Sequence, residues 1–330
     1  MSLSNADLKN ILANYKIISD FKVKKPKTGI SHKNWIIKIN KSKLVLREIR
    51  DDESEQDILF EFELLNKLTK NGFKYKIPNP IKNKSKKFIT EYKNKKYWAY
   101  NFVEGDLFKL NKHNIKNIAK LIAEFHKITK TIKIKYIKKW PGPYSLSRFR
   151  LQIEEELNKP KNIKLTTYDK IFFKHSKIAL ELTDYLLFSP NKQIYDALPK
   201  IPIQGEIYSE NILVNKNKIS GIIDFEHCRN EIKIKDICRF FVRTLVKTKG
   251  QLDISFAKQF IKEYNKTFSL SKEELLILPD VLISEALNAF YWDYVLGKDK
   301  KDFKKRIENS IMFADWCFKN RKKLIKELSH

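Results

Sequence analysis

The sequence predicts an α+β fold with two lobes, a small β-rich N-terminal lobe and a larger helical C-terminal lobe. Three observations lead to this prediction. From Tyr15 to about Val103, short runs of β-branched and aromatic residues are separated by polar turns. After Gly105, apolar residues recur mainly at helical spacing, and a single short crossing joins the two halves. We therefore place the domain boundaries at residues 1–103 and 104–330.

The N-terminal lobe contains two pairs of short β-rich runs, and the runs of each pair are joined by a polar turn that contains Asn and Lys. Such pairs predict β-hairpins, because a short polar turn lets the chain reverse between two strands. The pairs are residues 35–40 with 44–49, and residues 88–92 with 97–103.

A helix is predicted between the two hairpins. Ile58, Phe62, Leu65 and Leu68 recur at helical spacing, which indicates an amphipathic helix over residues 54–70. The Asn-Gly pair that follows is a C-cap signal, and two prolines come soon after it.

The C-terminal lobe is predicted to be mainly helical, with one β-rich island at residues 201–225. The clearest helix covers residues 114–127, where apolar side chains share one face. Further helices are predicted over residues 147–157, 168–187, 233–246, 255–264, 272–296 (broken or kinked at Pro279) and 302–328.

The chain has 330 residues and a formal net charge of +28, from 67 Lys and Arg against 39 Asp and Glu. The basic residues are mostly lysines spread along the whole chain, whereas arginine, the better fork for phosphates and bases, is scarce. We therefore interpret most of the charge as lysines on a solvated surface. Nucleic-acid binding is the least favoured of the functions that stay open. The hydrophobic content of 42% rules out a disordered chain.

The three cysteines form neither a CxxC pair nor an even framework, so reduced thiols are expected rather than a disulfide scaffold or a zinc ribbon. The first residues lack the basic start and apolar stretch of a signal peptide. The longest apolar runs are far shorter than the ~20 residues of a membrane-spanning helix. A cytoplasmic protein with no membrane partner is expected.

The β-rich island carries the candidate chemistry. Glu206 lies five residues before Asn211, and Asp224 lies thirteen residues after it. Residues 211–224 form a predicted hairpin, which brings the three side chains to one end of two paired strands. One carboxylate can accept a proton from an attacking hydroxyl, while a second carboxylate and an amide oxygen suit magnesium, a hard cation that prefers oxygen ligands.

The same segment resembles the catalytic and metal-binding segments of the aminoglycoside phosphotransferase, type II homoserine kinase and choline kinase superfamily. That superfamily has a bilobal protein-kinase-like fold, and its pattern is H-G-D-x-x-x-x-N, a strand, and then D-F. Asn211 matches the Asn, and Asp224 with the following Phe matches the metal-binding D-F. Asp236 resembles the Asp of a structural Y-D-L-A segment, and the run that ends at His126 resembles the family's L-A-x-L-H helix.

The N-terminal half resembles the nucleotide-binding elements of that superfamily in the same order. Gly29-Ile-Ser31 looks like the nucleotide-covering loop, and Arg47 stands in the V-L-R position. Glu61 occupies the helix position whose carboxylate pairs with Arg47, and Glu63, two residues along, is the alternative. The hinge is matched by Phe102, Val103 and Glu104. The resemblance implies that these residues bind the nucleotide.

Two positions depart from the superfamily pattern. Glu206 replaces the catalytic Asp, and Gln204 replaces the His two residues earlier. Glutamate keeps the charge and the proton acceptor but reaches one methylene further, so catalysis depends on where the acceptor hydroxyl lies. A catalytically inactive, pseudokinase-like nucleotide-binding module is therefore the alternative to an active enzyme.

The resemblance implies a small-molecule kinase that uses ATP and Mg²⁺. Asn211 and Asp224 would hold the metal, Arg47 would contact the phosphates, and Glu206 would align the acceptor hydroxyl. The implied acceptor is a small hydroxyl compound: an amino alcohol, a hydroxy amino acid such as homoserine, or a sugar.

Overall fold

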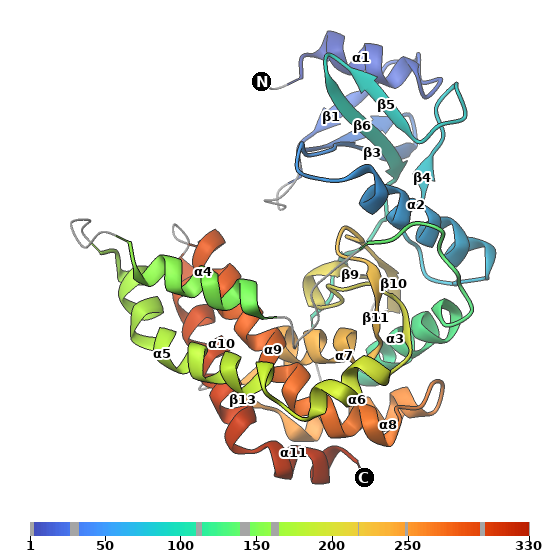
Figure 1. Cartoon of the computed structure of the whole chain (residues 1–330). Coiled ribbons are helices and arrows are strands. Elements are labelled where there is room, and N and C mark those ends of the chain that lie inside the picture. Colours follow the sequence, from blue (N-terminus) through green and yellow to red (C-terminus); the bar gives the residue numbers. More distant parts are fainter. Residues whose placement is uncertain are drawn as a thin grey trace. The chain divides into compact units, whose positions relative to one another are not determined.

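A computed structural model describes residues 3–26, 33–109, 114–138, 146–159, 165–216, 218–247, 250–297 and 301–329 (Figure 1). The described chain forms two compact units. The first contains Met1–Phe108, Ile132–Lys138 and Glu210–Glu226, and the second contains Lys109–Thr131, Lys139–Ser209 and His227–His330. The α+β class, with a β-rich N-terminal region and a helical C-terminal region, is confirmed. The boundary between residues 103 and 104 stays a prediction.

The first unit contains a six-stranded antiparallel sheet and two helices. Four of the strands follow the path β1-β2-β3-β6, and β4 and β5 both pair with β6. The elements are α1 (Asn5–Ala13), β1 (Lys22–Lys24), β2 (Asn34–Ile39), β3 (Ser42–Glu48), α2 (Glu55–Lys70), β4 (Pro80–Ile81), β5 (Ile89–Tyr92) and β6 (Lys95–Asn101).

Both predicted hairpins of this sheet are confirmed, as β2–β3 and β5–β6. Their turns place Asn40, Lys93 and Asn94 at positive φ angles of 50°, 49° and 57°. Tight hairpin turns require this left-handed backbone, and asparagine tolerates it better than most residues.

Helix α1 was missed by the sequence prediction. Leu8, Ile11 and Leu12 are buried against the sheet, at the spacing of one helical face. Ser4 and Asp7 form a reciprocal capping box at its start. Both signals are visible in the sequence, so this helix was predictable.

A second, three-stranded sheet completes the first unit, in the order β10-β9-β7. It contains β7 (Asp106–Leu107), β9 (Ile212–Asn215) and β10 (Lys218–Ile222), and it confirms the predicted hairpin. The loop at Lys76 docks on β10, because Lys76 N–H donates to Ser220 O at 2.9 Å and Ile222 N–H donates to Lys76 O at 3.0 Å. A Cβ on Gly221 would lie 2.5 Å from Lys76 O, so this close approach requires glycine.

The second unit is mostly helical, with two short β-pairs, β8–β11 and β12–β13. Its helices are α3 (Ile115–Thr129), α4 (Ser147–Leu157), α5 (Thr167–Leu187), α6 (Asn191–Ala197), α7 (Ile234–Phe240), α8 (Ile254–Asn265), α9 (Lys272–Gly297), α10 (Lys301–Lys319) and α11 (Arg321–Leu328). Its strands are β8 (Lys200–Ile203), β11 (Arg229–Ile232), β12 (Val246–Lys247) and β13 (Gln251–Leu252).

Three helical predictions in this unit need correction. The single helix expected at 302–328 is two helices, which meet at Asn320, where the backbone leaves helical geometry. The helix predicted over 233–246 ends as α-helix at Phe240 and continues as one turn of π-helix, Phe241–Leu245. The break considered at Pro279 is absent, because α9 runs through this proline as one helix.

Helix α9 is the central helix of this core. It packs against α10, α7 and α5, and its stretch Lys272–Leu296 is long and apolar enough to cross a membrane by length and composition. However, 83% of the most apolar window of that stretch is buried inside the protein, which is the behaviour of a core helix.

Candidate active site

Arg47 is a buried cation of the first unit. It lies on β3 opposite Trp98, and its guanidinium stands 5.8 Å from the ring centroids of both Trp98 and Tyr100. Its Nε donates to Asn34 Oδ1 at 3.2 Å, and its Nη2 lies 3.7 Å from Asp224 Oδ1. Rings and polar partners thus fix the guanidinium in one place.

Glu61 is buried on α2 and is coupled electrostatically to Arg47. Burial raises the pKa of Glu61 to about 7, although the positive charges of Arg47 and Lys138 act to lower it. Burial also acts to lower the pKa of Arg47, but Tyr100, Asp224 and Glu61 outweigh it and the pKa is raised. Arg47 therefore stays charged, while the pairing of Glu61 with it stays a prediction.

Asp224 and Asn211 lie at adjacent ends of the β9–β10 hairpin. Asp224 follows β10 with φ 64°, a left-handed backbone that few non-glycine residues adopt and that is concentrated at functional sites. The backbone N–H of Ile223 donates to Asn211 O at 3.0 Å, which ties the two strand ends together. Asn211 is itself buried.

This pair of oxygen donors fits magnesium. Within the described residues, no group of three or more His, Cys, Asp or Glu side chains lies close enough to hold a metal ion. Magnesium does not need such a cage, because it is usually held by one or two side chains together with water and substrate phosphates. The carboxylate of Asp224 and the amide oxygen of Asn211 are ligands of this kind.

Glu226 acts electrostatically on Arg47 and Glu61, and the sequence analysis did not predict it as a site residue. It is buried, its Oε2 lies 3.6 Å from Arg50 Nη1, and Lys138 Nζ donates to its backbone oxygen. Strand alternation could not have identified it, because the backbone between Asp224 and Glu226 is left-handed and then turns, rather than extended.

The predicted hinge residues lie next to β3 and the second sheet. Phe102 N–H donates to Lys43 O at 3.3 Å, and Lys43 Nζ pairs with Glu104 at 2.8 Å. Val103 is buried, and its Cγ1 would lie 2.7 Å from a Cβ on Gly221. The other two predicted nucleotide-binding residues, Gly29 and Ser31, lie outside the described residues.

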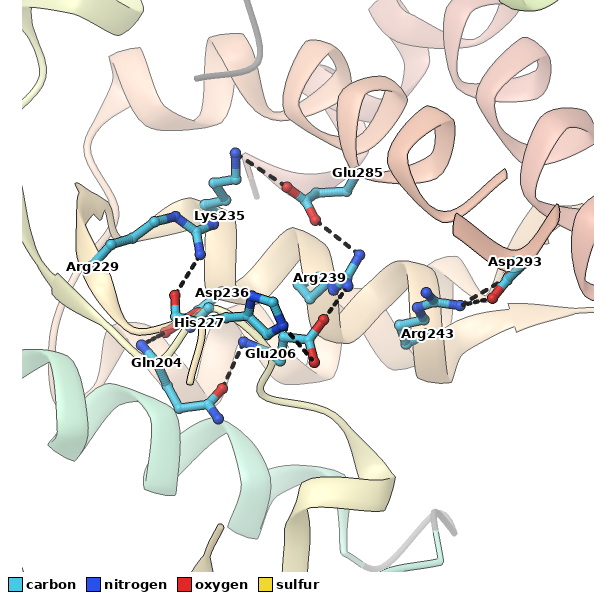
Figure 2. A network of polar contacts seen from close by, with 11 residues as sticks. Gln204, Glu206, His227, Arg229, Lys235, Asp236, Arg239, Arg243, Glu285 and Asp293 are labelled. Atoms are coloured by element: carbon cyan, nitrogen blue, oxygen red, sulfur yellow. Dashed lines mark hydrogen bonds and ion pairs between the residues drawn. The ribbon is translucent and has the colours of Figure 1, made fainter. Parts of the chain in front are cut away.

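Glu206 belongs to the second unit, on a loop between β8 and the 3₁₀ turn Ser209–Asn211 (Figure 2). Asp236 accepts hydrogen bonds from Gln204 N–H at 3.0 Å and Gly205 N–H at 2.7 Å, and Gln204 Oε1 accepts one from Glu206 N–H at 2.7 Å. Gly205 has φ 89°, and a Cβ there would lie 2.3 Å from His227 O. The loop backbone is therefore held in a conformation that requires glycine.

A buried polar chain anchors Asp236 in turn. His126 on α3 lies 3.0 Å from Asp236 Oδ2 through Nε2, and its Nδ1 lies 2.8 Å from the hydroxyl of Tyr264. His126 and Asp236 are each 0% exposed. The two residues that resemble the family's helix and Y-D-L-A segment thus have a structural role: they hold the backbone of the Glu206 loop in place.

The carboxylate of Glu206 contacts two basic side chains, Arg239 on α7 and His227 in the turn before β11. Arg239 Nη2 lies 2.5 Å from its Oε1, and His227 Nε2 lies 3.9 Å from its Oε2. Burial acts to raise the pKa of Glu206, but Arg239, His227 and Arg243 outweigh it and the pKa is lowered. Glu206 is therefore ionised at neutral pH and can accept a hydrogen bond from a hydroxyl.

The predicted site residues are thus distributed over both units. Arg47, Glu61, Asn211 and Asp224 share the first unit, whereas Glu206 belongs to the second. The hairpin that brings Asn211 and Asp224 together is observed, and the placement of Glu206 beside them stays a prediction.

Comparison with known proteins identifies the family. A model of the phosphotransferase enzyme family matches residues 22–267. A homoserine kinase of Agrobacterium fabrum is 21% identical over 289 residues, which cover 87% of this chain and 84% of that protein.

Solved structures share the fold. A microcompartment-associated aminopropanol kinase aligns with a TM-score of 0.69 at 11% identity, over 97% of this chain and 98% of that one. The amicoumacin kinase hAmiN, in complex with AMP-PNP, Ca²⁺ and Ami, aligns with a TM-score of 0.68 at 14% identity, over 95% and 96% of the two chains. The family match covers most of the sequence, including both the Arg47–Asp224 cluster and the Glu206 loop, and the chain belongs to the phosphotransferase enzyme family.

Proposed function

We propose that the protein is an ATP- and Mg²⁺-dependent kinase that phosphorylates the hydroxyl group of a small molecule. The observation that carries this proposal is the arrangement at the end of the β9–β10 hairpin. Asp224 has a left-handed backbone there and its Oδ1 lies 3.7 Å from Arg47 Nη2, while the neighbouring Ile223 is hydrogen-bonded to Asn211. Family membership supports it, as does one structural neighbour, hAmiN, in complex with AMP-PNP and Ca²⁺.

In this proposal, residues of the first unit bind the nucleotide and its metal ion. Arg47 contacts the α- and β-phosphates of ATP, and Asp224 and Asn211 hold magnesium, which neutralises charge on the phosphates when bound. The hinge at Phe102–Glu104 and the loop at Gly29–Ser31 bind the remainder of the nucleotide, as the family resemblance implies.

Glu206 orients the acceptor. Its ionised carboxylate accepts a hydrogen bond from the attacking hydroxyl and takes its proton as the oxygen bonds to the γ-phosphorus. The bond between that phosphorus and the bridging oxygen of ADP breaks. The phosphoryl transition state is loose, so most of the catalysis comes from placing the hydroxyl in line.

The acceptor is a hydroxy amino acid such as homoserine, or an amino alcohol. The homoserine kinase relative aligns over 87% of this chain, and the aminopropanol kinase shares the fold. A net charge of +28 also favours ATP and zwitterionic acceptors over polycations such as aminoglycosides. A small sugar is the remaining class, and a cytoplasmic location fits these metabolic substrates.

An inactive nucleotide-binding module is the second candidate, because glutamate stands where the family pattern has the catalytic aspartate. A screen for ADP release against homoserine, other hydroxy amino acids, amino alcohols and sugars separates the two functions. We expect turnover with one of these classes, loss of turnover in Asp224→Asn, and no change in Asp51→Asn, an exposed carboxylate paired with Lys95. Thermal stabilisation by ATP without turnover on the whole panel would instead support the module.

A further inference from the structure

Arg239 is in direct contact with the carboxylate of Glu206, the residue at the family's catalytic position. The family pattern assigns no role to Arg239. It lies on α7, three residues after the loop anchor Asp236, and its side chain is 8% exposed. Its Nη2 is 2.5 Å from Glu206 Oε1, a short charge-assisted contact (Figure 2).

The position of Arg239 is itself fixed from the other side. Its Nη1 lies 3.4 Å from Glu285 Oε2, and the other oxygen of Glu285 lies 3.3 Å from Lys235 Nζ. Figure 2 shows these side chains as a row of alternating charges between the Glu206 loop and α9. Glu285 and Lys235 are 3% and 4% exposed, so the row is buried and its members have little freedom to move.

Glu206 is therefore held at both ends. Its backbone N–H is bonded to Gln204 Oε1, and Asp236 holds the backbone of the two preceding residues. A glutamate carboxylate has one more rotatable bond than an aspartate, so a fixed backbone alone does not fix its oxygens. The contact with Arg239 removes that remaining freedom.

We propose that Arg239 is a positioning residue that holds the carboxylate of Glu206 where an acceptor hydroxyl can reach it, and so makes glutamate work at a position where the family pattern has aspartate. The role of this contact in catalysis rests on the proposed kinase function, whereas the contact itself is observed in the structure whatever the function.

The contact makes Glu206 a weaker base, and a phosphotransferase can work with a weak base at this position. Arg239, with His227 and Arg243 nearby, lowers the pKa of Glu206 against the opposing effect of burial, which weakens the carboxylate as a base. In a loose phosphoryl transition state, little proton transfer is needed early, so a well-placed weak base serves better than a mobile strong one.

The experiment compares Arg239→Met and Arg239→Lys with Lys233→Met in the full-length protein. Lys233 is a matched control, because it is a buried cation at the start of α7 whose partner is Glu274, outside the row. Two quantities are measured: kcat with its KM values, and the titration of the Glu206 carboxyl by ¹³C NMR, assigned by difference with Glu206→Gln.

In Arg239→Met we expect kcat to fall by at least about tenfold with little change in the KM for ATP, because placement of the hydroxyl is lost. The pKa of Glu206 should rise, so the acid limb of the kcat profile should move to higher pH. Arg239→Lys keeps the charge without the planar fork and should recover part of both effects. Lys233→Met should leave both quantities unchanged.

Glu206→Asp is the second variant, needed if Arg239→Met does not fold. It withdraws the carboxylate from Arg239 by one methylene, and kcat should fall on the order of a hundredfold. Activity equal to wild type in this variant would overturn the proposal, and so would an unchanged Glu206 titration in Arg239→Met.

The two proposals fail in different ways. If the wild type turns over no acceptor, the kinase function is wrong, yet the NMR titration still decides whether Arg239 holds the Glu206 carboxylate. If the wild type is active and Arg239→Met keeps full kcat, the kinase function stands and the positioning role is wrong.

Discussion

Glu61 shows how burial, more than pairing, sets the ionisation of a carboxyl in the first unit. An unfolded glutamate titrates near pH 4.3, whereas burial raises the pKa of Glu61 to about 7 in the folded protein. The folded state therefore binds the proton more tightly than the unfolded state. Stability contributed by the protonated form is present below pH ~4.3 and is lost as the pH rises toward 7.

We expect Glu61→Gln to remove this pH dependence. Relative to the wild type, the variant should gain unfolding free energy as the pH is raised from about 4.5 to about 7.5, because glutamine carries no charge to desolvate. Denaturant unfolding at a series of pH values measures the difference.

Glu63, two residues along α2, is the control for this prediction. Burial acts to raise its pKa, but hydrogen bonds from Lys67 and the Lys135 backbone outweigh it and lower the pKa. Glu63→Gln should therefore show the opposite sign, with a loss that grows as the pH rises. A common sign in both variants would contradict the assignment for Glu61.

At the residue scale, the spacing of residues along the sequence predicted the candidate site residues that one hairpin brings together. Asn211 and Asp224 are an example, because the length of the hairpin fixes which strand ends meet. Arg239 and Glu226 were not predicted as parts of the site. Arg239 reaches Glu206 across 33 residues of sequence, and only the packing of α7 beside the loop brings them together.

At the scale of elements, α7 is the anchor of the Glu206 loop through one buried carboxylate. Asp236 accepts two backbone N–H groups and contacts His126, all within 3.0 Å. Its removal leaves buried donors without an acceptor, each at a penalty of about 1–3 kcal/mol.

We expect Asp236→Ala to lower the unfolding free energy by about 2–5 kcal/mol. Asp253→Ala is the comparison, because that carboxylate caps α8 through the Phe256 N–H and its loss is limited to about 1 kcal/mol. Chemical denaturation of both variants gives the comparison. Equal losses would show that Asp236 is no more than a helix-terminal residue.

The hairpin that carries Asp224 depends on a second close approach. Gly221→Ala places a methyl group against Lys76 O, which the structure locates 2.5 Å from that position. The Lys76 loop must move, so we expect a loss of about 1–3 kcal/mol, read as a lower Tm and weaker ATP-dependent stabilisation. Ser220→Ala, which removes a single exposed 3.3 Å bond to Glu104 O, should be nearly neutral. A neutral Gly221→Ala would contradict the need for glycine.

Elements with strong periodicity were predictable, and short ones were not. The helix predicted at 54–70 is α2, because its apolar positions repeat over several turns between a Ser54 cap and a positive-φ Gly72. Strands β4, β7, β12 and β13 have two residues each and no period to detect. The π-helical turn after α7 depends on tertiary packing, and no local signal marks it.

At the scale of the whole molecule, the charge of +28 comes mostly from lysines that are spread along the whole sequence. Within the described residues, Arg47 lies near the Asp224 carboxylate and against the Trp98 ring in the first unit, and Arg239 pairs with Glu206 in the second. We therefore expect the lysine excess to add a diffuse positive field that attracts ATP over distance.

We expect the KM for ATP to rise with ionic strength while kcat stays nearly constant. The Debye length falls from about 10 Å at 0.1 M to about 3 Å at 1 M, so distant lysines stop contributing while contacts in the site persist. Steady-state kinetics in increasing KCl at fixed free Mg²⁺ measure both constants, and RNA or duplex DNA binding is followed over the same salt series. A KM independent of salt would show that the field does not act on the nucleotide. Nucleic-acid affinity with a steep salt slope would assign the charge to a polyanionic partner instead.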